Sequence, residues 1–152
     1  MTPHRAHDPY DWPALLALIT RAFAGMEGRI DPPSSLHRLT PDGIARQAEE
    51  GEVWVIGTPP VACIFLTPQG DALYLHKLAV DPAAQRQGHA RRLMALAETR
   101  ARALGLPALE LSTRVELFEN HATFRALGFQ QVAETRHDGY DRTTSLTFRR
   151  TL

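Results

Sequence analysis

The sequence predicts an α/β (α+β) fold in which a mixed, mostly antiparallel central sheet carries helices on both faces. Three observations predict it. Two amphipathic helical segments come first, three short apolar segments with tight turns follow, and helical and apolar segments then alternate to the end. The chain of 152 residues has the length of one domain, and no repeat or composition shift divides it. We therefore expect a single domain over residues 1–152.

The first third of the chain is predicted to form two helices joined by a loop. Apolar residues recur at helical spacing from Tyr10 to Phe23, and Pro13 suits the first turn. A second helix is expected to start after Thr40, whose side chain can cap it, and to run to about Glu50. The segment between them, Gly25 to Leu39, is rich in glycine, proline and serine and is predicted to be a loop.

Three strands with short connections are expected next, at Val53–Gly57, Val61–Thr67 and Ala72–Val80. Short connections favour antiparallel pairing. The middle segment is continuously apolar, which is typical of a strand covered on both faces. Only Thr2–His7 could supply a strand before the first helix, and Pro3 disfavours it there. The first strand is therefore expected to be short or absent.

The second half alternates helices and strands. A helix over Gly88–Leu104 has one apolar stripe, with Gly105 at the C′ position. The stripe consists of Ala90, Leu93, Ala97, Ala101 and Leu104. The remaining predicted elements are a strand at Leu109–Thr113, a helix at Asn120–Leu127, and strands at Phe129–His137 and Thr143–Arg149. The complete order is (β)ααβββαβαββ.

Composition excludes several classes of partner. The net charge is zero, so nothing favours a nucleic acid or an anionic membrane surface. No apolar run reaches the length of a membrane span, and the first residues lack an apolar signal core, which favours a cytoplasmic protein. The single cysteine, Cys63, excludes an intrachain disulfide, and its apolar surroundings favour a buried, inert thiol. The sequence leaves the oligomeric state open between a monomer and a homodimer.

The most informative segment is Leu75–Leu93, in which a strand, a turn at Asp81-Pro82 and a glycine-bearing loop lead into a helix. The first N–H groups of a helix have no intrahelical partner, and the helix dipole adds positive potential, so this junction suits an anion. Gly88 allows close approach to the backbone, and three neighbouring arginines add charge. The pattern predicts a phosphate site, although an ordinary strand–loop–helix connection would also produce it.

Two segments resemble motifs of the GNAT superfamily of N-acyltransferases. Leu78-Ala79-Val80-Asp81-Pro82, followed by Gln85-Arg86-Gln87-Gly88-His89-Ala90, is similar to the family's acyl-CoA signature of a strand end and Gln/Arg-x-x-Gly-x-Gly/Ala. Asn120–Phe129 resembles a later motif, an Asn-led helix that closes in Leu-Gly-Phe. With the elements between them, the two segments cover most of residues 53 to 150. The resemblance implies a GNAT-like fold, acetyl-CoA as the acyl donor, and no metal.

The resemblance also implies roles for the residues of the donor site. The pyrophosphate of acetyl-CoA would rest on backbone N–H groups, with Arg86 and Arg91 near the phosphates and Gln85 shaping the loop. These N–H groups belong to Gln87, Gly88, His89, Ala90 and Arg91. Leu78 and Val80 would offer backbone groups to the pantetheine arm, and the Leu78 N–H would be the oxyanion donor.

The proton chemistry departs from the family at one position. Family members often have a tyrosine that reprotonates the CoA thiolate where this chain has Phe124, so Tyr140 is the candidate acid, with water as an alternative. Asn120 could bond the pantetheine or the substrate, or could cap its own helix. His76 is favoured as the base that deprotonates the amine, because it lies on the strand that leads to the thioester. The full set of candidate bases is His76, His121, Glu110 and Asp141.

The loop Gly25–Leu39 lies where the resemblance places the acceptor. Two adjacent prolines stiffen it and both signs of charge are present, which favours a positioning role beside the alternative of a solvated linker. Glu27 or Asp31 could hold an ammonium group and Arg29 a carboxylate. Both signs together would suit an amino-acid-like acceptor.

Other site chemistries lack their motifs. The seven histidines show no HExxH spacing, no Walker lysine follows the Gly88 loop, and neither GxGxxG nor GxSxG occurs. The predicted function is transfer of an acetyl group from acetyl-CoA to a primary amine of a small-molecule or amino-acid-like acceptor, by direct attack in a ternary complex. The alternative is a non-catalytic acyl-CoA-binding sensor or regulatory module, which Phe124 at the usual tyrosine position favours.

Overall fold

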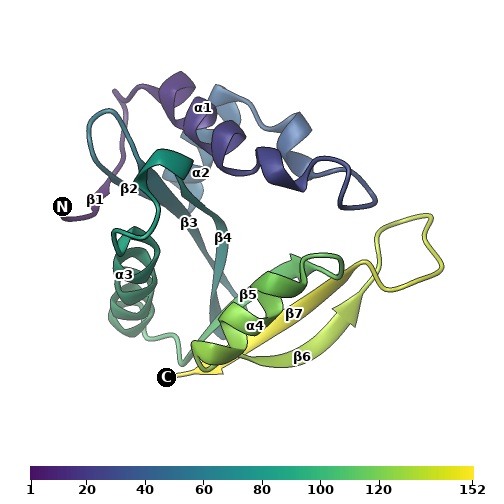
Figure 1. The fold of residues 1–152 in the computed structure, drawn as a ribbon. Helices are drawn as coiled ribbons and strands as arrows, with labels where there is room; N and C mark the ends of the chain where they lie inside the picture. Colours follow the sequence, from purple (N-terminus) through teal and green to yellow (C-terminus); the bar gives the residue numbers. More distant parts are fainter.

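The computed structural model describes all 152 residues and contains one mixed, seven-stranded sheet with helices on both faces (Figure 1). The strand order is β1-β2-β3-β4-β5-β7-β6, and only β4 and β5 are parallel neighbours. The strands are β1 (His4–Arg5), β2 (Glu52–Ile56), β3 (Ala62–Gln69), β4 (Ala72–Val80), β5 (Ala108–Arg114), β6 (Gln130–Thr135) and β7 (Ser145–Thr151). The α-helices are α1 (Trp12–Ala22), α2 (Pro41–Glu50), α3 (His89–Ala103) and α4 (Phe118–Ala126), and the 3-10 turns are η1 (Ala24–Met26), η2 (Ser35–Arg38) and η3 (Pro82–Ala84). The predicted element order is confirmed, with a first strand of two residues.

Both early helices begin at side-chain caps that the sequence contains. The Asp11 carboxylate accepts a hydrogen bond from the Ala14 N–H at 3.0 Å at the start of α1. The Thr40 hydroxyl accepts one from the Gly43 N–H at 3.0 Å, and α2 ends at Glu50 as predicted. None of the helices combines the length and the apolar character that a bilayer crossing requires.

The strands β2, β3 and β4 form the predicted antiparallel meander. β4 covers the predicted range Ala72–Val80, and β3 is buried on both faces from Ala62 to Leu66, as its continuous apolar sequence indicates. Both residues of β1 pair with β2. Pro3 stands just before this short strand, so its missing N–H removes no hydrogen bond from the ladder.

Two apolar clusters lie on opposite faces of the sheet. On one face α1 and α2 cover β2, β3 and β4, and Leu18, Ile44 and Phe65 are buried between the layers. On the other face α3 buries Leu93 and Ala97 against the sheet, and α4 contributes to the same cluster. Removal of this apolar surface from water on both faces is the main term that stabilises the fold.

The buried face of α3 differs from the predicted stripe. The buried residues of α3 are His89, Leu93, Met94, Ala97 and Ala101. Ala90 was predicted on this face and lies at the same angle around the helix as Ala97 and Ala101, but it is exposed in the first turn, next to the exposed loop residues 85–88. Leu104 is also exposed, at 42%, because the helix ends before it. Gly105 has a φ of +72° just after the helix end, which confirms its predicted C′ position.

A buried ion pair joins β2 to α3. Glu52 is 5% exposed and accepts two hydrogen bonds from the Arg100 guanidinium, both of 2.8 Å. The Trp54 indole N–H donates a third at 2.8 Å. Burial raises the pKa of Glu52, but the hydrogen bonds from Arg100 and Trp54 outweigh burial, and the net pKa lies below its ordinary value.

Replacing Arg100 by Met is expected to lower the free energy of unfolding by about 3 kcal/mol, because the Glu52 carboxylate stays buried without its cation. Urea denaturation at pH 7 measures the loss. The matched control is Arg102→Met on the same helix, because Arg102 is exposed and its partner Glu98 keeps a second arginine, Arg150. We expect the control to lose less than about 0.5 kcal/mol. Equal losses in the two variants would contradict a stabilising role for the buried pair.

The contribution of this ion pair also depends on pH. Because the pKa of Glu52 is depressed in the folded state, the stabilisation is present above the unfolded-state pKa and is lost as pH falls through the folded-state pKa. The stability curves of wild type and Arg100→Met are therefore expected to converge in acid.

Candidate active site

The parallel strands β4 and β5 separate shortly after they meet. Their pairing covers Ala72 with Ala108, Leu73 with Leu109 and Tyr74 with Glu110, and it ends there. β4 nevertheless continues to Val80, and β5 pairs on its other side with β7 along its whole length. Figure 1 shows the two strands diverging. The far half of β4 thus presents an edge without a β5 partner inside the sheet.

A β-bulge interrupts β4 in this separated half. The pairs Phe65–His76 and Cys63–Ala79 leave two residues of β4, Lys77 and Leu78, opposite a single residue of β3. Lys77 has a φ of +50°, a conformation that residues with a Cβ rarely adopt. Bulges bend a strand and change the direction of its side chains. The bulge therefore determines the direction in which Lys77 and Leu78, the part of β4 predicted to lie beside the thioester, face the gap between β4 and β5.

The loop between β4 and α3 is shaped by left-handed backbone conformations. Arg86 has a φ of +65° and Gly88 a φ of +82°. Gly88 is the N-cap residue of α3, and no side chain caps the helix there. A Cβ at this position would meet only the Arg92 guanidinium, at 3.6 to 3.7 Å. The first N–H groups of α3 consequently lack a protein acceptor at an exposed helix end, a geometry that suits an anion.

The Arg92 side chain folds back over this helix end. Its guanidinium donates to the Gln87 carbonyl at 2.9 Å and lies 3.2 Å from His89 Nδ1. Because arginine can only donate, His89 Nδ1 is the acceptor and the imidazole proton is assigned to Nε2, which is buried without a partner. Burial lowers the pKa of His89, and the nearby Arg92 lowers it further, so this imidazole is neutral. Arg86 and Arg91 are exposed and form no ion pair.

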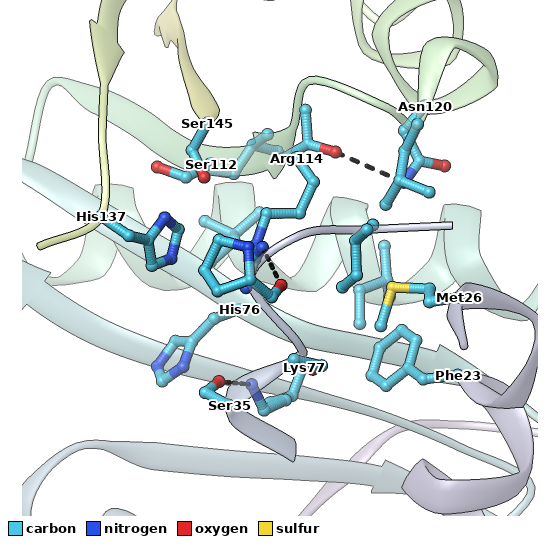
Figure 2. A pocket seen from close by; sticks show the side chains of 18 of the residues that line it. Phe23, Met26, Ser35, His76, Lys77, Ser112, Arg114, Asn120, His137 and Ser145 are labelled. Carbon is cyan, nitrogen blue, oxygen red and sulfur yellow. Dashed lines mark hydrogen bonds between the residues drawn. The ribbon is translucent and has the colours of Figure 1, made fainter. Parts of the chain in front are cut away.

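A cavity of about 680 Å³ occupies the space between the separated strands. The loop after α1, the strands β4 and β5, α4 and the loop between β6 and β7 all contribute to its walls (Figure 2). The predicted site residues that line it are His76, Leu78, Asn120, Phe124 and Tyr140. The predicted phosphate residues, Gln85 to Arg91, do not line it. The structure therefore divides the predicted residues between this cavity and the N-terminal end of α3, with Val80 at the end of β4 between the two.

Among the four candidate bases, only His76 lines the cavity. Its Nε2 lies 3.1 Å from the Thr67 hydroxyl, and burial, with a smaller effect of Lys77, lowers its pKa to about 4. His121 is buried, with Nε2 2.9 Å from the backbone carbonyl of Arg114, so it serves the structure.

The other two candidate bases are also placed away from the cavity. Glu110 is paired with Arg149 at 2.8 Å. Asp141 is exposed. Neither carboxylate belongs to the cavity walls, so His76 is the candidate base that the geometry leaves.

The candidate acid and the phenylalanine that replaces the usual tyrosine both reach the cavity. The Tyr140 hydroxyl donates a 2.6 Å hydrogen bond to Asp31, and this bond raises the pKa of Tyr140. Phe124 lies with its ring centroid 6.0 Å from that of Phe129 and 6.2 Å from that of Phe148. Phe124 therefore extends the apolar core to the cavity wall, and Tyr140 brings the only phenolic hydroxyl on the β6–β7 side.

The alternative role of Asn120 as a helix cap is wrong. α4 begins at Phe118, and its N-cap is Leu117, which has no side chain able to accept a hydrogen bond. Asn120 lies inside the first turn, and its amide donates to the Thr113 hydroxyl at 3.5 Å across the top of the cavity (Figure 2). The Asn120 side chain therefore lines the cavity and does not cap the helix.

The predicted acceptor residues of the Gly25–Leu39 loop are all paired with other protein groups. Glu27 contacts His37 at 2.9 Å and lines a smaller cavity of about 180 Å³. Arg29 contacts Glu119 at 2.6 Å, and hydrogen bonding from Arg29 lowers the pKa of Glu119 to about 2.

Asp31 is held in the same way. It accepts from Tyr140 and from Arg142, the latter at 3.2 Å, and neither Asp31 nor Arg29 lines the main cavity. In this structure these charges fasten the loop to α4 and to the β6–β7 loop, and their binding of an acceptor stays a prediction.

Four charged residues of the cavity, Arg38, Lys77, Arg114 and Asp138, were not predicted as site residues, and two of them come from the central strands. Lys77 reaches it from β4 and Arg114 from β5 (Figure 2). The sequence contains a signal for each. Lys77 is the only lysine in the chain, next to the favoured base, and Arg114 directly follows a strand that the apolar pattern identifies.

Comparison with known families and structures agrees with this geometry. A family model described as the acetyltransferase (GNAT) family matches residues 12–129. No curated protein matches the chain.

Solved structures share the whole fold. The ribosomal-protein-S18-alanine N-acetyltransferase from Escherichia coli matches with a TM-score of 0.74 and 20% identity, over 99% of this chain and 92% of that one. A GNAT family acetyltransferase from Elizabethkingia anophelis, with acetyl-CoA bound, matches with a TM-score of 0.70 and 17% identity, over 99% and 97%. An acetyltransferase from Bacillus subtilis, in complex with CoA, matches with a TM-score of 0.66 and 16% identity, over 99% and 98%.

The state of His76 can be tested directly. Because its pKa is lowered to about 4, the imidazole is expected to stay neutral down to about pH 5, which an NMR titration of its ring signals measures. An ordinary titration near pH 6.5 would contradict its burial. Between pH 6.5 and about pH 4, the pKa values of this histidine in the unfolded and folded chain, the unfolded chain binds a proton that the folded chain does not. Stability therefore falls as pH falls through this window. We expect His76→Gln to reduce that fall by about 2–3 kcal/mol.

Proposed function

Because the chain belongs to the GNAT family of acetyltransferases, whose model matches residues 12–129, we propose that it moves an acetyl group from acetyl-CoA to a primary amine. The acceptor is a small molecule or an amino-acid-like compound, and the amine attacks directly in a ternary complex. The observation that carries the proposal is the early separation of β4 from β5, which opens a cavity beside an unpaired strand edge.

The donor half of the reaction uses the start of α3. The pyrophosphate rests on the uncapped N–H groups at Gln87 to Arg91, and Arg86 and Arg91 approach the phosphates as free cations. Gly88 supports this assignment, because its φ of +82° turns the backbone into the helix without a side chain in the way. The solved neighbours with acetyl-CoA or CoA bound support the choice of ligand.

The pantetheine arm lies along the free edge of β4. Val80 and Leu78 offer it backbone hydrogen bonds in place of those that β5 would have made, which brings the thioester to the bulge. The Leu78 N–H donates to the thioester oxygen as negative charge develops on it. Leu78 lines the cavity, so the carbonyl carbon and the amine meet at its wall.

The reaction transfers one proton at each end. The amine nitrogen attacks the thioester carbon, and its excess proton passes to His76, directly or through water. Collapse of the tetrahedral intermediate breaks the C–S bond, and the thiolate takes a proton from Tyr140. A pKa of about 4 keeps His76 unprotonated at neutral pH, and the raised pKa of Tyr140 keeps its proton in place until it is needed.

Direct attack is favoured over an acyl-enzyme because the protein offers no activated nucleophile. Cys63 is fully buried, and burial raises its pKa to about 12. Four serines line the cavity: the hydroxyls of Ser34, Ser35 and Ser112 are hydrogen-bonded to Leu36, Lys77 and Thr147, Ser145 has no side-chain hydrogen bond, and none is bonded to a histidine.

A non-catalytic acyl-CoA sensor is the second candidate. Phe124 favours it, because the ring is packed against Phe129 and Phe148 and provides no proton. A panel of amines with acetyl-CoA and a thiol-release assay separates the two functions. Turnover supports the transferase, whereas tight binding of acetyl-CoA without thiol release from any amine supports the sensor.

The phosphate site is tested by the same substitution at both ends of α3. Gly88→Glu is expected to weaken CoA binding by about a hundredfold or more, because a carboxylate then projects where the phosphates rest. Gly105→Glu is the matched control, since Gly105 also has a positive φ and lies at the other end of the helix. Both variants carry a similar backbone strain, of about 1–2 kcal/mol. Calorimetry with CoA measures the difference, and equal affinities in the two variants would place the phosphates elsewhere.

The acid is tested by removing one hydroxyl. Tyr140→Phe is expected to lower kcat by about a hundredfold with a smaller change in KM, since general acid catalysis contributes about that factor or more. Tyr10→Phe is the control, because Tyr10 packs beside α1 and does not line the cavity. Wild-type kinetics in Tyr140→Phe would assign the proton to water.

A further inference from the structure

We propose that the cavity holds a carboxylate of the acceptor between Lys77 and Arg114, so that the acceptor is an amine that carries a carboxylate, such as an amino acid. This inference rests on the proposed acetyl transfer and names the class of its second substrate.

The two cations enter the cavity from opposite walls, Lys77 from β4 and Arg114 from β5 (Figure 2). All of their hydrogen-bond partners are neutral. Lys77 Nζ donates to the Ser35 hydroxyl at 3.3 Å, and Arg114 donates to the carbonyls of Pro32 at 2.6 Å and Pro33 at 3.2 Å. Neither side chain forms an ion pair, although both are only partly exposed.

Two carboxylates, Asp31 and Glu116, lie close enough to attract Arg114, but neither forms an ion pair with it, and Glu116 Oε1 is buried without a hydrogen-bond partner. Arg142 binds Asp31 at 3.2 Å and lies 3.8 Å from Glu116, and Tyr140 donates to the other oxygen of Asp31. Asp138 is the one acidic residue that lines the cavity, and it is exposed. A third cation, Arg38, also lines the cavity and forms no ion pair. The cavity walls therefore carry three cations and one carboxylate, while the predicted acceptor charges of the loop, Glu27, Arg29 and Asp31, are paired.

An anion bound between Lys77 and Arg114 would offset the free-energy cost of keeping two positive charges partly buried and close together. Burial lowers the pKa of Lys77, and the neighbouring Arg114 lowers it further, while burial also lowers the pKa of Arg114. Removing charged groups from water without an opposite charge is unfavourable. A carboxylate would accept charge-assisted hydrogen bonds from both side chains, and the planar guanidinium matches its two oxygens.

The position of Lys77 places this anion beside the reacting atoms. Lys77 lies in the bulge between His76, the candidate base, and Leu78, the candidate oxyanion donor. In an α-amino acid the amino nitrogen is two bonds from the carboxylate carbon, so a carboxylate held there keeps the amine beside the same wall. The apolar residues Phe23 and Met26 then remain for the side chain of the acceptor.

Binding of product analogues tests the site without depending on turnover. With CoA at saturation, we expect N-acetyl-L-leucine to bind the wild-type protein at least ten times more tightly than N-acetyl-L-leucinamide, which has the same shape without the charge. Calorimetry at pH 7.5 measures both affinities. Equal affinities, or no binding of either compound at millimolar concentration, would overturn the proposal.

Substitutions test which residues cause the preference for N-acetyl-L-leucine over N-acetyl-L-leucinamide. Lys77→Gln keeps a group that can bond Ser35 but removes the charge, and Arg114→Gln removes the second cation. Each is expected to lower the preference for the acid about tenfold, whereas Arg46→Gln, which removes an exposed and unpaired charge on α2, leaves it unchanged. Circular dichroism confirms that the variants fold. A preference that survives in both cavity variants would place the anion elsewhere.

Turnover separates this inference from the proposed function. With acetyl-CoA, L-leucine is expected to exceed L-leucinamide in kcat/KM by at least tenfold. Equal turnover of the two would refute the anion site and keep the transferase. Selective binding of the acid analogue with no acetylation of either amine would keep the anion site and refute acetyl transfer to these acceptors.

Discussion

Parallel pairing between β4 and β5 stops after three residue pairs, and both the unpaired edge of β4 and the cavity beside it depend on that early separation. If the pairing continued beyond Tyr74 and Glu110, the backbone groups of β4 would be used inside the sheet and the space would be closed. The bulge at Lys77 and Leu78 adds to this effect, because it changes the direction of β4 where the strand has lost its neighbour. The other strand pairs stay together along their ladders, with one further irregularity between β6 and β7.

The charges around the opening fall into two groups with different roles. In the Gly25–Leu39 loop, Arg29 is paired with Glu119 of α4 and Asp31 with Arg142 of the β6–β7 loop. They fix the loop over the cavity, and because they are exposed, each contributes little energy alone. Lys77 and Arg114 are less exposed and have no acidic partner. The two strand cations of the cavity therefore have no ion pair within the protein, whereas Glu27, Arg29 and Asp31 of the loop each have one.

The environments of the titratable groups also agree with a division of labour. Burial lowers the pKa of His76 to about 4, the hydrogen bond to Asp31 raises the pKa of Tyr140, and burial raises the pKa of Cys63 to about 12. In the proposed reaction His76 would accept a proton and Tyr140 would donate one, and both line the same cavity. The N-terminal end of α3, which we propose as the phosphate site, lies outside the cavity, so in this proposal donor binding and acceptor choice depend on different residues.

The sequence alone determined the features that depend on a few neighbouring residues. Thr40 capped α2, Gly105 ended α3, and the run Ala72–Val80 formed β4 with the predicted bounds, because caps, glycine conformations and apolar patterns act over short distances. The order of elements and the glycine loop before α3 followed from the same local signals, and together they indicated the family.

Tertiary structure decided what depends on residues distant in the chain. Ala90 is exposed although it shares the angular stripe of Ala97 and Ala101, because the burial of a helix residue also depends on which distant segments pack against its turn. Asn120 belongs to the cavity because α4 starts earlier than its sequence indicates. Lys77 and Arg114 share a cavity because β4 and β5 are adjacent in the sheet and then separate, and no local pattern encodes that meeting of two distant strands.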